Sequence, residues 1–230
     1  MEIINSFVRA FQLIFEFDKG VYEIILLSLY VSLSSTVIST IMGVPLGIFL
    51  GLKDFRGKKV LIRIIYSLMS TPPVIVGLAV FLVIARKGPL GFLGLTYTPP
   101  AMVIAQVVLV TPIVVGLVFN NVVEKGSNIR NMAFTLGANK LQTLVLLLNE
   151  LRSNILVAVT TGYGRAISEV GAVMIVGGNI RGHTRVMTTS IAMLRSMGDY
   201  ETAIALGLVL LLISFIINSI IYNYQRARGV

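Results

Sequence analysis

The sequence predicts an all-α membrane protein that crosses the bilayer several times. Hydrophobic residues make up 56% of the 230 positions and charged residues only 13%, which leaves too little polar surface to cover a soluble domain. The charges gather in short clusters, and the apolar runs between them are long enough for helices to cross a hydrocarbon core of roughly 30 Å. These runs lack the period-two alternation of membrane β-strands, so helices are expected.

One membrane domain over residues 1–230 is expected, with five transmembrane helices. An amphipathic helix over 2–17, with Ile4, Phe7 and Phe11 on one face, should lie in the membrane interface before the first span. A cytoplasmic loop over 121–151 should join the third and fourth spans. The five spans are predicted at about 24–52, 64–85, 99–120, 153–179 and 202–224.

Basic residues predict the orientation of these spans. The densest cluster, Lys53 to Arg63, lies in a short loop, where the positive-inside rule is strongest. We therefore expect a multi-pass protein of the cell membrane with its N-terminus outside and its C-terminus in the cytoplasm. The net charge of +9 is attributed to this orientation, and no nucleic-acid partner is expected. No cleavable signal peptide is expected either, because the start lacks a basic leader.

The second and third spans contain prolines that predict interruptions. Pro72 and Pro73 lie in the middle of the second span, and proline removes a backbone donor and displaces the carbonyl one turn earlier. Gly77 follows one turn later, and Thr111-Pro112 predicts a second kink at comparable depth in the third span. Two interpretations stay open: simple packing kinks, or broken helices along a translocation route.

The stretch 127–140, between the third and fourth spans, predicts an amphipathic helix. Ile129, Met132, Ala133 and Leu136 repeat at i, i+3, i+4 and i+7, which is typical of one apolar helix face. Gly137 follows as a residue that lets a helix stop and turn. Such a helix could lie passively on the membrane surface or insert into a groove on a soluble partner.

The fourth span carries two charges, Arg165 and Glu169. Their spacing of four predicts that they share a helix face and pair, which reduces the cost of burying either one. The pair could be structural glue or part of a functional site. After this span, Arg181, His183 and Arg185 form either a positively charged outer mouth or a solvated loop.

Ala133-x3-Gly137, with an apolar run after it, resembles the Glu-Ala-Ala-x3-Gly loop of permease subunits of ATP-binding-cassette importers. In that family the loop forms the coupling helix, which fits a cleft on the ATPase subunit. Asn131 and Met132 stand where the family has Glu and the first Ala. The resemblance implies that the ATPase contacts are Ile129, Arg130, Asn131, Met132, Ala133, Leu136 and Gly137.

The fourth-span region narrows this resemblance. Its pattern Arg-x3-Glu-x-Gly-Ala, followed by Gly-Asn-Ile-x-Gly-x-Thr, is similar to molybdate, tungstate and sulfate permeases and most similar to tungstate permeases. Ser168 and Val170 replace a Gly and a Phe of the molybdate group, which favours tungstate. The candidates for a translocation pathway or gate are Pro72, Pro73, Gly77, Pro112, Arg165, Ser168, Glu169, Gly171, Asn179, Gly182 and Thr184.

The resemblance implies a permease that imports a tetrahedral oxyanion into the cytoplasm, and tungstate is the expected oxyanion. It also implies a homodimer in the membrane lipid, two ATPase subunits and an extracytoplasmic substrate-binding protein. No Gly-rich phosphate loop ending in Lys-Ser or Lys-Thr occurs in the sequence, so ATP hydrolysis is expected on a separate subunit, and this chain is expected to be neither an enzyme nor a cofactor binder. Three alternatives stay open: a permease for molybdate, sulfate or another small solute, an ion-coupled secondary carrier, and a non-transport scaffold.

Overall fold

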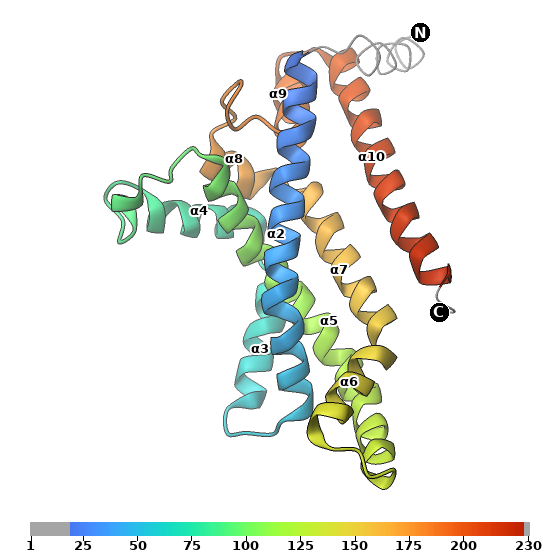
Figure 1. Cartoon of the computed structure of the whole chain (residues 1–230). Coiled ribbons are helices and arrows are strands. Elements are labelled where there is room, and N and C mark those ends of the chain that lie inside the picture. Colours follow the sequence, from blue (N-terminus) through green and yellow to red (C-terminus); the bar gives the residue numbers. More distant parts are fainter. Residues whose placement is uncertain (1–18, 228–230) are drawn as a thin grey trace.

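The computed structural model describes residues 19–227, and these contain helices but no strand. The all-α class is therefore confirmed for this part of the chain, while the predicted interfacial helix at 2–17 lies outside the described residues. Three helices are long and apolar enough to cross a membrane, or five if two bent helix pairs each count as one span. The elements are α2 Lys19–Leu52, α3 Lys58–Met69, α4 Pro73–Ile84, η1 Gly91–Leu93, α5 Pro99–Thr135, α6 Lys140–Glu150, α7 Arg152–Ile167, α8 Gly171–Gly177, α9 Met187–Ser196 and α10 Tyr200–Ala227 (Figure 1).

The helices α2 and α5 form the centre of the molecule. A stripe of glycines on α2, at Gly43, Gly47 and Gly51, faces a stripe of valines on α5. A Cβ added at Gly47 would lie 2.8 Å from Val118 Cβ and 2.9 Å from the Val115 carbonyl oxygen, so the two backbones approach closely. Small residues at every fourth position allow such an approach, which gives dispersion contacts where lipid provides no hydrophobic driving force.

We expect Gly47→Leu to destabilise the protein, because the new side chain must force α2 and α5 apart. Overpacking of this kind costs about 1–3 kcal/mol. Thermal unfolding of the purified chain in detergent should occur at a lower temperature. Gly207→Leu on α10 is the matched control, because no described atom lies within 4 Å of an added Cβ there. Equal unfolding temperatures for the two variants would contradict the tight α2–α5 contact.

The predicted second span is broken at its prolines. α3 and α4 meet at 104°, so α4 lies across the direction of α2 (Figure 1). Pro72 caps α4 in an extended conformation and Pro73 is its first residue, where the missing N–H costs nothing. The interruption predicted at Pro72-Pro73 is confirmed, and the two helices form either one broken span or a re-entrant loop.

The predicted third span and the predicted amphipathic helix are one element. α5 continues through Pro112 and ends only at Thr135, so neither a break at Pro112 nor a separate helix at 127–140 is present. The valines at 110, 114, 118 and 122 are all buried and continue one packing face along α5. Because this face stays in contact with α2 and with α6–α7, the tertiary structure keeps the helix intact past both polar stretches.

Gly137 ends α5 in a turn, as predicted. Its φ of 78° is left-handed, and the Ala138 N–H reaches back to the Ala133 carbonyl at 2.9 Å. Asn139 then begins α6 with a capping box, since it accepts from the Gln142 N–H and donates its own N–H to the Gln142 side chain.

The predicted fourth span, 153–179, is also broken. α6 and α7 are bent by 60° at Leu151, and α7 ends at Ile167, before the short helix α8. Glu169 therefore lies beyond the end of α7, and the prediction that Arg165 and Glu169 share one continuous helix face is wrong.

Candidate functional site: the helix break at Ser168–Val170 and the α5–α6 turn

Glu169 links three helices at the break between α7 and α8. Its side chain is 3% exposed, and Oε2 lies 3.3 Å from Arg165 Nη1, which confirms the predicted pair. The other carboxylate oxygen accepts from the Ala172 N–H at 3.0 Å, and the backbone carbonyl accepts from the Thr188 hydroxyl at 2.8 Å. Glu169 thus replaces the backbone hydrogen bonds that the break removes and ties α7, α8 and α9 together.

The two helix breaks are packed against each other. A Cβ on Gly77 of α4 would lie 2.5 Å from Ala172 Cα, and one on Gly171 would lie 2.9 Å from a methyl group of Val74. The structure therefore packs α4, which begins at the Pro72-Pro73 break, against α8, although the two segments are about one hundred residues apart. Pro112, by contrast, is buried inside the continuous helix α5.

Three polar or charged residues form a stripe on α7. Thr161, Arg165 and Ser168 follow one another at i, i+4 and i+7, which is one helix face. Thr161 and Ser168 are exposed and donate to backbone carbonyls of α7, whereas the Arg165 side chain is 35% exposed and keeps further donors free to point outward. A partly exposed guanidinium requires a polar or aqueous surrounding, so this face is unsuited to lipid.

A buried polar seam behind the break was not predicted. Ser35 donates to the Gln106 side-chain oxygen at 2.7 Å, and the Gln106 amide donates to the Ala166 carbonyl at 2.9 Å, so α2, α5 and α7 are joined by side chains. The Met187 N–H donates to the Ser28 hydroxyl at 2.8 Å, which connects α9 to the same face of α2. The spacing of serines at 28, 32, 35 and 39 is a one-face helical pattern that could have indicated this seam.

The candidates Asn179, Gly182 and Thr184 lie at the other end of α8, in the loop before α9. Thr184 donates to the Gly177 carbonyl at 2.5 Å and accepts from the Ile180 N–H at 3.0 Å, so it closes the loop on itself. Asn179 and Gly182 both have left-handed backbones, with φ of 53° and 72°. The conformation of the loop accounts for all three residue types. Their hydrogen bonds among the described residues lie within the loop and its neighbouring helices, and none joins Glu169.

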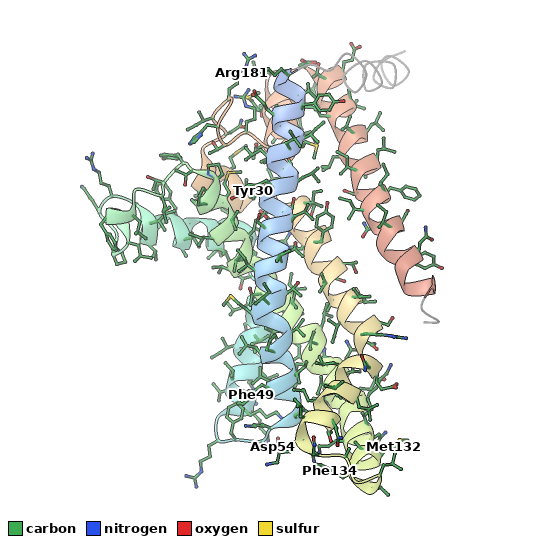
Figure 2. All side chains as sticks on the ribbon, in the orientation of Figure 1. Tyr30, Phe49, Asp54, Met132, Phe134 and Arg181 are labelled. Atoms are coloured by element: carbon green, nitrogen blue, oxygen red, sulfur yellow. The ribbon has the colours of Figure 1, made fainter. Side chains whose placement is uncertain are left out.

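The α5–α6 turn exposes apolar side chains at the opposite end of the molecule. Of the predicted stripe, Ala133 is 1% exposed and Ile129 packs against the core, whereas Met132 is 65% and Leu136 is 81% exposed. Figure 2 shows Met132 and Phe134 at this end, with Asp54 of the α2–α3 loop at the same end. We call the exposed set Met132, Phe134, Leu136 and Leu141 the α5–α6 apolar cluster.

Charged and polar residues border this cluster. Arg130 and Asn131 are exposed beside it on α5. Lys58 lies 2.9 Å from Asp54, and its hydrogen bond and charge hold the pKa of the Asp54 carboxyl below its usual value, with a smaller contribution from Arg130. Since Asp54 is almost fully exposed, its pair with Lys58 contributes little to stability. The lowered pKa keeps the Asp54 carboxylate ionised, so a negative charge lies near the α5–α6 apolar cluster.

The chain is similar to known membrane transport proteins along most of its length. The family described as "Binding-protein-dependent transport system inner membrane component" matches residues 43–229. The "Tungstate uptake system permease protein TupB" of Peptoclostridium acidaminophilum is 55% identical over 97% of this chain and 98% of its own length. The protein of the same name from Campylobacter jejuni is 37% identical over 97% and 94%. A "Probable anion ABC transporter permease protein" of Haloferax volcanii is 40% identical over 84% and 85%.

Proposed function

The chain belongs to the ATP-binding-cassette permease family of binding-protein-dependent inner membrane components, and from this we propose that it is the permease subunit of a tungstate importer. Two of the relatives are named as tungstate uptake permeases, and one of them is similar along nearly its whole length. A tetrahedral oxyanion is the substrate class of the proposal. The family assignment replaces the alternatives of an ion-coupled secondary carrier and a non-transport scaffold.

The length of α5 is the observation that carries the coupling part of this proposal. Its uncharged part, Pro99–Val123, extends for about 37 Å and already spans a hydrocarbon core of roughly 30 Å. The remaining turns, Glu124–Thr135, extend about 18 Å further and end in the α5–α6 apolar cluster. Exposed apolar side chains that far from the bilayer suit a protein partner rather than a passive rest on the membrane surface.

The partner is an ATPase subunit, one on each of two permease copies. Ala133 and Gly137 shape the turn, while Met132 and Leu136 supply apolar contacts and Arg130 and Asn131 border them. Asn131 is uncharged where the family has Glu, so docking relies on shape and apolar burial. The orientation that follows has the α5–α6 turn in the cytoplasm and the start of α2 on the outside.

The pathway lies between two copies of the chain, along the polar stripe of α7. A second copy, or water between the copies, provides the polar surrounding that Arg165 needs at membrane depth. Arg165 attracts the oxyanion, and Glu169 holds the guanidinium in position. Gly77 and Gly171 form the packed junction of α4 with α8 that flanks this site, and Pro72 and Pro73 begin α4 there.

Transport follows from movement of rigid helices around these breaks. ATP-driven closure of the two ATPase subunits draws the α5 ends of the two copies together. The side-chain links from α2 through α5 to α7 carry this motion to the α7–α8 break. The site then alternates between the outside and the cytoplasm. The binding protein outside selects the anion.

Reconstitution of the complete system tests the proposal. The permease, its ATPase subunit and the binding protein are placed in liposomes, and ATP hydrolysis is measured with tungstate, molybdate or sulfate. We expect tungstate to stimulate hydrolysis at the lowest concentration. Preferential stimulation by molybdate or sulfate would assign the permease to that anion instead, and tungstate uptake without the ATPase subunit would contradict an ATP-driven permease.

A further inference from the structure

A cavity of about 560 Å³ lies between the start of α2, α9 and α10, away from the α7–α8 break. Its walls include Leu26 and Tyr30 of α2, Leu194 of α9 and Leu206 of α10, so most of its lining is apolar. We call it the α2–α10 cavity. Its volume is far more than a four-oxygen anion requires.

Positive charge is concentrated at one end of the α2–α10 cavity. Arg181, His183 and Arg185 all line it, and Figure 2 shows Arg181 beside the start of α2. Glu23 lines it as well, so the two guanidiniums exceed the single carboxylate. The cavity is therefore amphipathic: cationic where the loop 181–185 lines it and apolar along the helices.

Arg185 lines the cavity and is anchored by the loop that carries it. Its Nη2 donates to the Asn179 carbonyl at 3.3 Å, and its Nε–H is buried away from the cavity with no hydrogen-bond partner among the described residues. The remaining guanidinium donors are the ones available to an anionic group in the cavity, since guanidinium groups bind phosphate through charge-assisted hydrogen bonds.

The length of the cavity matches one leaflet of the bilayer. Its lining on α2 runs from Gly20 to Tyr30, about 15 Å along the helix axis, which is half of a hydrocarbon core of roughly 30 Å. Arg181 lies beside the start of α2, which corresponds to the headgroup level, and Arg185, two residues before the Met187 that bonds to Ser28, lines the cavity further along α2. A free oxyanion would use only this cationic end and leave the apolar walls bare.

We propose that the α2–α10 cavity binds an anionic phospholipid, with its phosphate on Arg181 and Arg185 and an acyl chain along Leu26, Tyr30 and Leu206. Charge complementarity and the leaflet-long apolar wall select this occupant. The lipid fills the space between α2 and α10 and so links α10 to the rest of the bundle on this side of the membrane. This binding is separate from transport of the oxyanion.

Native mass spectrometry of the full-length protein tests the proposal, with phosphatidylglycerol compared with phosphatidylcholine of the same acyl chains. We expect phosphatidylglycerol to be retained roughly tenfold better, from the charge on two arginines. Arg181→Gln with Arg185→Gln should remove the preference, and Arg86→Gln with Lys87→Gln should keep it. The control pair removes the same charge from exposed residues that do not line the cavity.

A second variant changes the apolar wall of the cavity and leaves the loop 181–185 intact, so its result does not depend on how that loop folds after the arginine substitutions. Leu26→Trp leaves the charges unchanged and obstructs the apolar wall, so it should lower phosphatidylglycerol retention by itself. Equal retention of the two lipids, or unchanged preference in both the double-arginine and the Leu26→Trp variants, would overturn the proposal. Displacement of phosphatidylglycerol by added tungstate would also overturn it and assign the cavity to the free oxyanion.

Discussion

Replacing Glu169 with alanine is expected to abolish oxyanion uptake and to lower the stability of the folded chain by about 3 kcal/mol. The carboxylate is buried, pairs with Arg165 and accepts the Ala172 N–H. Its loss leaves a membrane-depth guanidinium unpaired and the start of α8 without an acceptor. Because Arg165 is partly exposed, the expected loss lies at the lower end of the range for broken buried pairs.

Thermal unfolding in detergent and uptake into liposomes that contain the whole importer measure the two effects. Glu201→Ala is the control, because it removes an exposed carboxylate at the start of α10. Glu169→Gln keeps an acceptor for the Ala172 N–H but loses the ion pair, so it should be intermediate in stability. The double variant Arg165→Ala with Glu169→Ala should be less destabilised than the sum of the two single variants. Strict additivity would show that the pair contributes nothing.

Replacing both Met132 and Leu136 with aspartate is expected to uncouple the permease from its ATPase while the membrane fold stays intact. Both side chains are largely exposed, so their replacement removes no contact from the core. Central apolar anchors of an interface contribute about 2 kcal/mol or more each, so binding of the ATPase subunit should weaken by at least about 100-fold. Uptake should be lost in parallel.

Copurification of the ATPase subunit with the permease, together with thermal unfolding of the permease alone, checks this expectation. Ser127→Asp with Asn128→Asp adds the same two charges to exposed polar positions at the same end of α5. This control should retain the ATPase if apolar contact is what the double variant removes. Retention of the ATPase by the Met132 and Leu136 variant would instead favour a helix end that serves only as a connection.

Local chemistry made several features of the fold predictable. Proline weakens a helix interior by removing a donor, and two adjacent prolines do so twice, so Pro72-Pro73 indicated a break without reference to any other residue. Gly137 marked a helix stop because it adopts a left-handed backbone at no steric cost. Arg165 and Glu169 were predicted to pair because two charges at membrane depth need each other, and they do so even though the helix between them ends.

Other features depended on which distant segments pack against each other, and the local sequence pattern does not specify this. Pro112 resembles Pro72 in isolation, yet α5 continues through it because its valine face stays packed on α2. The amphipathic stripe at 129–136 was predicted as one face, but the contact with α6 turns Ala133 inward and leaves Met132 and Leu136 outside. Packing between distant segments overrode the local pattern in both places.

The sequence by itself determined the membrane class, the break at Pro72-Pro73, the charge pair at the fourth span and the resemblance to oxyanion permeases, because hydropathy, backbone chemistry and motif spacing are local properties. Only the tertiary structure decided that the breaks at Pro72-Pro73 and Ser168–Val170 meet, that one continuous α5 ends in the α5–α6 apolar cluster, and that Arg181 and Arg185 line a cavity beside α10. These arrangements are contacts between segments far apart in the chain. They depend on how closely whole helices pack, which no single stretch of residues specifies.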